Sequence, residues 1–299
     1  MSSPALVRSI ERGAKDHAGH GPPCRTTRDA LAAAAARLAK VSETPRLDAD
    51  LLMAHALDVS REDLLLKQLE REAPAEYEAF LTRRLAHEPV AYIIGRRAFW
   101  TIELEVGPGV LIPRADSETL IEAALEQFGE KGPATILDLG TGPGTLLLAA
   151  LDQWPEATGL GLDRSEAALG FARRNAHRLG LAGRARFCAG DWEAGVEGRF
   201  DLILCNPPYV ETDAALAPQV ASWEPKEALF AGVDGLDDYR RLAPLLPFWL
   251  APGGVACVEI GAGQEAAVRA LFVAQGFTIS SRGDLNGVAR CLILALDGG

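Results

Sequence analysis

The chain has 299 residues, of which 48% are hydrophobic and 24% are charged. This length and composition are those of a folded protein of about two domains, and they exclude fibrous and wholly disordered proteins. Its 41 acidic residues outnumber its 30 basic residues, and the net charge of −11 disfavours a partner held mainly through phosphate groups.

The five cysteines are scattered and form no Cys-x-x-Cys pair or zinc-like spacing. We therefore expect a reduced, cytoplasmic protein without a bound metal. No apolar run approaches the length of about 18 residues that a membrane helix needs, and the N-terminus lacks the apolar core of a signal peptide. These features predict neither secretion nor membrane binding.

Residues 1–25 combine glycine, proline and polar side chains without a periodic apolar face, which predicts a mobile extension. His17, His20 and Cys24 lie close together there, and we interpret them as incidental rather than as metal ligands. Residues 26–88 carry apolar side chains at helical spacing and predict about four short helices.

Two capping patterns mark this helical region. Thr26 or Thr27 can cap the first helix, and Ser60, three residues before Asp63, can cap the third. Nothing in the region has a catalytic pattern, so its chemistry lies elsewhere in the chain.

The pattern changes at Pro89. In residues 98–106 apolar and polar side chains alternate towards the end of the segment. Gly107-Pro108-Gly109 is typical of a turn, and residues 110–112 are apolar again. This arrangement predicts a β-hairpin that joins two domains.

From residue 135 onward, apolar strands alternate with helical stretches, which is typical of a doubly wound parallel sheet. A helix beginning at Asp116 or Ser117 precedes this region, and residues 277–296 predict two further strands around a turn. The apolar runs of the alternating region lie at residues 135–139, 159–162, 185–188, 200–205 and 255–260.

A glycine-rich loop follows the first of these strands, with the sequence Asp138-Leu139-Gly140-Thr141-Gly142-Pro143-Gly144. Glycines there let the chain turn sharply and let a ligand approach the backbone. Thr145 stands where a dinucleotide fingerprint has its third glycine, which disfavours a nicotinamide cofactor. A purely structural strand-to-helix turn remains the alternative.

The next two strands end in residues suited to a nucleoside. Asp163 lies nineteen residues after Gly144, where a carboxylate can accept both hydroxyls of a ribose or cap the helix that starts near Ser165. Asp191 and Trp192 follow the third strand, where an indole can cover an adenine ring. Together with the glycine loop, these residues favour an adenosine-containing cofactor.

The most specific motif is Asn206-Pro207-Pro208-Tyr209, which follows the strand at residues 200–205. Ligands of open α/β sheets bind at this end of the strands. The two prolines remove N–H donors and leave backbone carbonyls free, so that with the Asn206 side-chain oxygen they offer two acceptors to one NH₂ group. Tyr209 offers a ring for stacking a flat substrate. The alternative is a plain Pro-Pro turn.

That geometry suits methyl transfer to a planar nitrogen. Such a nitrogen is a poor nucleophile because its lone pair is delocalised. Two acceptors would hold it in line with an electrophilic methyl group and stabilise the positive charge that develops, without a strong base. We expect Asn206, Pro207 and Tyr209 to be the catalytic residues.

In order and kind, these motifs resemble those of the HemK/PrmC family of peptide-chain release factor glutamine methyltransferases, from about residue 26 onward. Asn-Pro-Pro-Tyr alone also occurs in adenine-DNA and guanine-RNA methyltransferases, but the order of all the motifs is more specific. The segments that carry the resemblance are residues 46–52, 88–93, 99–100 and 111–114, the glycine loop and the Asn206 tetrapeptide.

The resemblance implies an α/β fold with a Rossmann-like, seven-stranded methyltransferase domain dependent on S-adenosylmethionine. A small all-helical N-terminal domain would recognise the protein substrate, and a β-hairpin would link the two. After the flexible extension predicted at 1–25 from composition, the implied segments are the helical domain at 26–88, the linker at 89–112 and the methyltransferase domain at 113–299.

The resemblance also implies site residues. Asn206, Pro207, Pro208 and Tyr209 would hold the glutamine of the Gly-Gly-Gln motif in class I release factors, and Phe99 would border that pocket. S-adenosyl-L-methionine, which is converted to S-adenosyl-L-homocysteine, would contact Gly140, Thr141, Gly142, Pro143, Gly144, Asp163, Trp192 and Asn206. Pro143 and Ala115 depart from the family's usual small polar residue and proline, and residues 1–25 have no counterpart.

Two other functions share parts of this pattern. A nucleobase amine methyltransferase is disfavoured because such enzymes need a basic platform, whereas residues 89–299 carry 17 basic and 27 acidic side chains. A non-catalytic adaptor is disfavoured because the glycine loop and the tetrapeptide are both intact. We expect a monomer that binds release factors and neither nucleic acid nor membrane.

Overall fold

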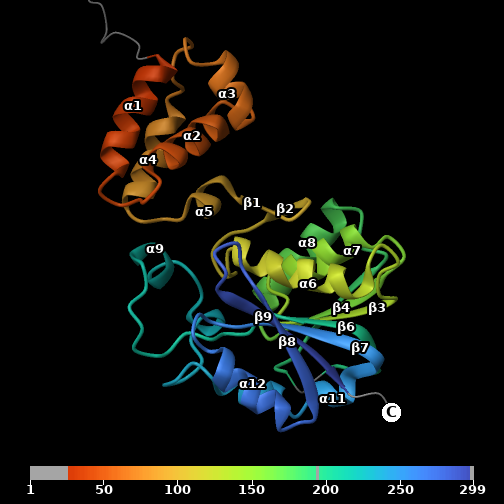
Figure 1. Cartoon of the computed structure of the whole chain (residues 1–299). Coiled ribbons are helices and arrows are strands. Elements are labelled where there is room, and N and C mark those ends of the chain that lie inside the picture. Colours follow the sequence, from red (N-terminus) through yellow and green to blue (C-terminus); the bar gives the residue numbers. More distant parts are fainter. Residues whose placement is uncertain (1–25, 193–194, 297–299) are drawn as a thin grey trace, which may run out of the picture. The chain divides into compact units, whose positions relative to one another are not determined.

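The computed structural model describes residues 26–192 and 195–296 (Figure 1). The predicted extension at residues 1–25, including the His17, His20 and Cys24 group, lies outside the described residues. The chain divides into two compact units, Met1–Glu78 and Ala79–Gly299.

Four helices fill the described part of the first unit and its border, as the sequence predicts. They are α1 (Thr27–Leu38), α2 (Pro45–Ala56), α3 (Arg61–Lys67) and α4 (Glu76–Leu85), the last of which crosses the border between the units.

The predicted caps of α1 and α3 are confirmed. Thr26 Oγ1 accepts a hydrogen bond from Asp29 N at 3.2 Å, and Ser60 Oγ accepts one from Asp63 N at 3.0 Å. Each bond satisfies a backbone N–H that has no partner within its helix.

The second unit begins with the end of α4, a short helix α5 (Val90–Ile94) and a hairpin. The hairpin consists of β1 (Arg96–Phe99) and β2 (Ile102–Glu105), which pair antiparallel from Arg96↔Glu105 to Phe99↔Ile102. The sequence-based placement of its turn at residues 107–109 is therefore wrong, and residues 110–112 form no strand.

Tertiary contacts explain the observed turn at Trp100 and Thr101. Trp100 has a φ of +52°, which is unusual for a bulky residue. Its backbone N–H donates to Glu118 Oε1 at 2.9 Å and its indole N–H to Gln153 Oε1 at 3.1 Å, while Thr101 Oγ1 donates to Asp152 Oδ2 at 2.6 Å. These partners lie far away in the sequence, so turn propensity alone could not place the turn.

A seven-stranded sheet forms the centre of the second unit, in the order β5-β4-β3-β6-β7-β9-β8 (Figure 1). The first five of these pair in parallel, whereas β9 pairs antiparallel with both β7 and β8. This confirms the predicted doubly wound sheet and the two final strands. The strands are β3 (Thr135–Leu139), β4 (Thr158–Asp163), β5 (Ala185–Ala189), β6 (Phe200–Cys205), β7 (Leu250–Glu259), β8 (Phe277–Gly283) and β9 (Ala289–Leu296).

Helices cover both faces of the sheet, each over its own hydrophobic cluster. One face carries α6 (Glu118–Phe128), α7 (Thr145–Gln153) and α8 (Glu166–Arg178). The other carries α10 (Asp237–Leu242), α11 (Leu246–Trp249) and α12 (Glu265–Val273), and the remaining short helices are η1 (Ala115–Ser117), α9 (Pro218–Ala221) and η2 (Lys226–Ala228).

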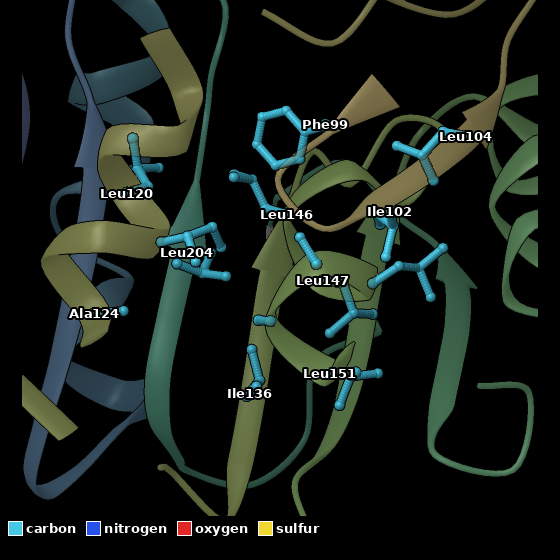
Figure 2. Packing of buried hydrophobic residues seen from close by; sticks show 14 of the residues in the cluster. Phe99, Ile102, Leu104, Leu120, Ala124, Ile136, Leu146, Leu147, Leu151 and Leu204 are labelled. Atoms are coloured by element: carbon cyan, nitrogen blue, oxygen red, sulfur yellow. The ribbon is translucent and has the colours of Figure 1, made fainter. Parts of the chain in front are cut away.

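The hairpin packs into the hydrophobic cluster on the sheet face that α6, α7 and α8 cover. Figure 2 shows Phe99, Ile102 and Leu104 packed with side chains of α7 and the sheet. Phe99 is 2% exposed and Leu104 is fully buried, so the hairpin is fixed within the second unit by burial of apolar surface.

Candidate active site

A cavity of about 370 Å³ lies at the carboxyl ends of the parallel strands. The strand order reverses between β3 and β6, and ligands of open α/β sheets bind at such switch points. Of the residues predicted from sequence, the cavity is lined by Gly140, Thr141, Gly142, Pro143, Asp163, Trp192, Asn206 and Pro208. Gly144, Pro207, Tyr209 and Phe99 are not among its lining residues.

The glycine loop needs its glycines for two separate reasons. Gly140 has a φ of +72°, and a Cβ there would lie 3.2 Å from the Trp192 ring, in the wall of the cavity. Gly144 has a φ of +88° and is the N-cap of α7, and a Cβ there would lie 2.7 Å from Leu148. The first glycine therefore lets Trp192 lie close to the loop, and the second permits the helix to pack.

Asp138, at the base of the loop, is a buried acid that faces the cavity. Its Oδ2 accepts hydrogen bonds from Thr141 Oγ1 at 2.6 Å and Leu147 N at 3.1 Å, whereas its Oδ1 has no partner among the described residues. Burial raises the pKa of Asp138 to about 7. An unpartnered buried carboxylate oxygen at a cavity wall is suited to a cationic group such as an ammonium.

Asp163 combines the two roles that the sequence left open. Its Oδ2 accepts from Gly142 N and its Oδ1 from Ser165 N, both at 2.8 Å, so it holds the glycine loop against the start of α8. Ser165 is itself the cap of α8. Each carboxylate oxygen can accept a second hydrogen bond, so the capping contact leaves room for ribose hydroxyls. Burial raises the pKa of Asp163.

Trp192 forms one wall of the cavity and is held in place from behind. Its φ is +53°, its side chain is buried, and its indole N–H donates to Asp238 Oδ1 at 2.7 Å. Arg241 bridges Asp238 and Asp191 at 3.7 and 3.0 Å. The ring is therefore fixed before any ligand arrives, as a stacking surface should be.

The Asn206 tetrapeptide leaves β6 directly at the cavity. Asn206 Nδ2 donates to Ser117 Oγ at 3.0 Å, which makes Oδ1 the amide atom available to a ligand. The Tyr209 hydroxyl points into the fold and donates to Glu259 Oε1 at 3.1 Å. Burial raises the pKa of Tyr209 well above its usual value. This hydroxyl is thus a structural anchor, and the ring is the part of Tyr209 left to meet a substrate.

The segment after the tetrapeptide returns over the cavity, which sequence reasoning did not foresee. Glu224 is buried and accepts from Ile112 N at 3.0 Å and Arg114 Nη2 at 2.6 Å. Arg164 Nη2 donates to Glu227 O at 2.9 Å. Ser117 and Glu259 were also missed, because each stands in an unremarkable sequence context and gains its role only through folding.

Two classes of feature are not found within residues 26–192 and 195–296. No group of three or more His, Cys, Asp and Glu side chains is arranged to hold a metal ion. No helix there combines the length and apolarity needed to cross a membrane.

Comparisons with known proteins agree on one kind of relative. Residues 29–95 match the family described as PrmC N-terminal domain, and residues 130–229 match a methyltransferase domain family. A release factor glutamine methyltransferase of Rhodospirillum rubrum is 47% identical over 84% of this chain and 79% of its own length. A second release factor glutamine methyltransferase, from Cereibacter sphaeroides, is 46% identical over 88% of this chain and 95% of its own length. A methyltransferase crystal structure from Pyrococcus furiosus is similar in fold, with a TM-score of 0.50, 18% identity and coverage of 71% of this chain and 95% of that one.

Proposed function

Since the chain belongs to the release factor glutamine methyltransferase family, we propose that it methylates the side-chain amide of the glutamine in the Gly-Gly-Gln motif of class I release factors. Membership of the family makes it a methyltransferase, and we infer S-adenosylmethionine as its methyl donor. The observation that carries the choice of acceptor is the Asn206 amide, which lines the cavity and is oriented by Ser117.

The residues around the cavity fit this cofactor. The unpartnered Asp138 Oδ1 suits the ammonium group, Asp163 suits the ribose hydroxyls, and Trp192 suits the adenine ring. When bound, S-adenosylmethionine supplies an electrophilic methyl group on its sulfonium. Gly140, with no side chain, keeps the backbone open where the cofactor would lie. The other proposed contacts are Thr141, Gly142, Pro143 and Gly144.

The tetrapeptide would act on the substrate amide. Asn206 Oδ1 and the Pro207 backbone carbonyl would accept the two N–H hydrogens of the glutamine amide and so hold its nitrogen for methylation. The methyl group would come from the sulfonium of S-adenosylmethionine, leaving S-adenosylhomocysteine, and the amide nitrogen would give up one proton to solvent. Pro208 and the Tyr209 ring would hold the flat amide. Phe99 lies in the core, so we give it no direct substrate contact.

Recognition of the release factor would fall to the helical region at residues 26–88, with residues 89–112 as linker and 113–299 as the catalytic domain. The match of residues 29–95 to the PrmC N-terminal domain supports this division. The helices of this region contain no residue of the cavity, which agrees with a role in binding rather than chemistry.

The direct test is methylation of a purified class I release factor. We expect the full-length chain with S-adenosylmethionine to add one methyl group to the glutamine, seen by mass spectrometry of the Gly-Gly-Gln peptide. A release factor with that glutamine changed to alanine is the matched control and should stay unmodified. Transfer of labelled methyl groups to RNA or DNA, with none to the release factor, would contradict the proposal.

A further inference from the structure

The turn between β8 and β9, at residues 284–288 and here called the Leu285 turn, lies at the same end of the sheet as the cavity. β9 runs antiparallel to β7, and Cys291 near the start of β9 pairs with Glu259 at the carboxyl end of β7. The residues that precede β9 therefore stand at the carboxyl edge of the parallel strands, where the cavity is.

The tip of this turn presents an apolar side chain to water. Leu285 is fully exposed, more than any other large apolar residue in the described ranges 26–192 and 195–296, and Val288 is 38% exposed. Single exposed apolar residues are common on protein surfaces, so exposure alone identifies no site. The structure around Leu285 adds two further observations.

The first observation is that hydrogen bonds fix the backbone of the turn. Asp284 Oδ1 accepts from Asn286 N at 2.8 Å and from Val288 N at 3.1 Å. The Asp284 N–H donates to Val288 O at 2.8 Å, and the Gly287 N–H donates to Asp284 O at 2.9 Å. Leu285 is therefore held out on a preorganised turn, which reduces the entropy lost when a partner binds it.

The second observation is that Arg290 joins the turn to the reactive amide. Its Nε donates to Asp284 Oδ2 at 3.2 Å, and its Nη2 pairs with Asp116 Oδ2 at 3.1 Å. Asp116 precedes Ser117, which accepts from Asn206 Nδ2 at 3.0 Å. Ser117 is buried whereas the Asp116 side chain is 49% exposed, so this path leads from the amide to the surface that carries the turn.

We propose that Leu285 is a docking contact for the release factor, against which an apolar part of the segment that carries the substrate glutamine packs. The inference rests on the proposed function, in which the glutamine side chain reaches Asn206. A glutamine side chain is short, so the main chain that carries it must lie on the surface around the cavity, where the Leu285 turn projects.

The charges next to Leu285 allow an apolar contact. The Asp284 side chain is 8% exposed and is paired with Arg290, which is 19% exposed and also paired with Asp116. A partner that covers Leu285 therefore removes water from apolar surface without leaving a free charge buried.

Two substitutions test the contact. Leu285→Ala removes most of the apolar area, and Leu285→Asp places a charge there. Because the Leu285 side chain is in solvent, neither change removes a contact within the fold, and thermal denaturation should show wild-type stability. We expect the KM for a purified class I release factor to rise about threefold in L285A and about tenfold or more in L285D, with kcat changed less than about twofold.

Phe248→Asp is the matched control. Phe248 is 70% exposed and lies in α11, directly before β7 begins at Leu250. It is therefore at the amino end of this strand, away from the cavity. The same charge placed there should leave KM and kcat unchanged. All three variants should bind S-adenosylhomocysteine with wild-type affinity, which calorimetry measures.

A second readout does not depend on activity. Benzoylphenylalanine, a photo-reactive residue, placed at position 285 should crosslink to the release factor peptides that flank the glutamine, whereas the same residue at position 248 should not. Mass spectrometry identifies the crosslinked peptides.

An L285D KM equal to that of wild type or F248D would overturn the inference, as would crosslinks from position 285 only to other parts of the release factor or to a second copy of this chain. A wild-type chain that leaves the release factor unmethylated would contradict the proposed function. The crosslinks from position 285 would then still decide whether the Leu285 turn contacts the release factor.

Discussion

The two ends of the cavity are held together in different ways. At the glycine-loop end, the contacts stay within one βαβ unit: Asp138 bonds Thr141, and Asp163 bonds Gly142 and Ser165. At the Asn206 end, they are remote, because Asn206 reaches back 89 residues to Ser117, and Tyr209 reaches forward 50 residues to Glu259.

This difference follows from what each end must do. A strand, loop and helix in succession already form a pocket for a nucleoside, so one βα unit organises the glycine-loop end. Two oxygen atoms that accept hydrogens from one amide must be held in a fixed direction. The prolines restrict the backbone, but they do not orient the Asn206 side chain. The Asn206 end therefore draws on η1, β7 and the segment around Glu224.

The largest expected effect comes from the Asn206 end. Asn206→Ala should lower kcat by about 100-fold or more, because it removes one of two acceptors that stabilise the transition state. Single-turnover methylation of a release factor measures this step. A rate within about threefold of wild type would contradict the role of Asn206.

Asp163→Ala is the matching change at the glycine-loop end and should affect cofactor binding rather than kcat. It should weaken binding of S-adenosylhomocysteine in calorimetry more than it lowers kcat at saturating cofactor. If both variants lose binding and turnover equally, the two ends are not functionally separate.

The same contrast explains how far sequence could go. Local patterns revealed the α1 and α3 caps, the alternating strands and the glycine loop, since each depends on neighbours within about one βα unit. The Asn-Pro-Pro-Tyr motif was equally visible. Ser117 and Glu259 were not, because their partners lie on other elements and no nearby pattern marks them.

The hairpin shows the same limit in the fold. Gly107-Pro108-Gly109 has strong turn propensity, yet the turn forms at Trp100, whose positive φ is stabilised by Glu118 and Gln153 on other elements. Long-range hydrogen bonds and the burial of Phe99 outweigh the local preference there. Such outcomes depend on contacts between distant segments, which periodicity does not report.

The contacts of Glu224 with Ile112 and Arg114, here called the Glu224 clamp, hold the segment that follows the tetrapeptide. Breaking them should lower stability and substrate binding moderately. Glu224→Ala leaves the Ile112 N–H and the Arg114 guanidinium without their partner. Because Arg114 is 36% exposed, water replaces part of the loss, and we expect a decrease of about 1–3 kcal/mol in the free energy of unfolding.

Urea denaturation measures this decrease, and the KM for release factor should rise in parallel because the clamped segment covers the cavity. Arg173→Ala, which breaks the exposed pair with Glu166, is the control and should change stability by less than about 1 kcal/mol. A loss no larger than that of the control would mean that the clamp does not organise this end.

The last expected effect is on stability alone, as a pH dependence that both ends share. Burial raises the pKa of Asp138 from 3.8 and that of Glu259 from 4.5, each to about 7. Each acid therefore holds its proton more tightly when folded, so the free energy of unfolding should fall as the pH rises from about 4 to about 7. At pH 8 both buried acids are charged, and their ionisation lowers the free energy of unfolding by its full amount.

The substitution E259Q should remove the part of this destabilisation that comes from the buried charge of Glu259. We expect it to raise the free energy of unfolding at pH 8 by on the order of 2 kcal/mol, and to change it little at pH 4, where the wild-type acid is largely protonated in both states. Thermal denaturation at the two pH values measures the difference. A variant that is more stable at pH 8 only would confirm that the buried charge of Glu259 is unfavourable, whereas equal destabilisation at both pH values would assign the Glu259 side chain to packing.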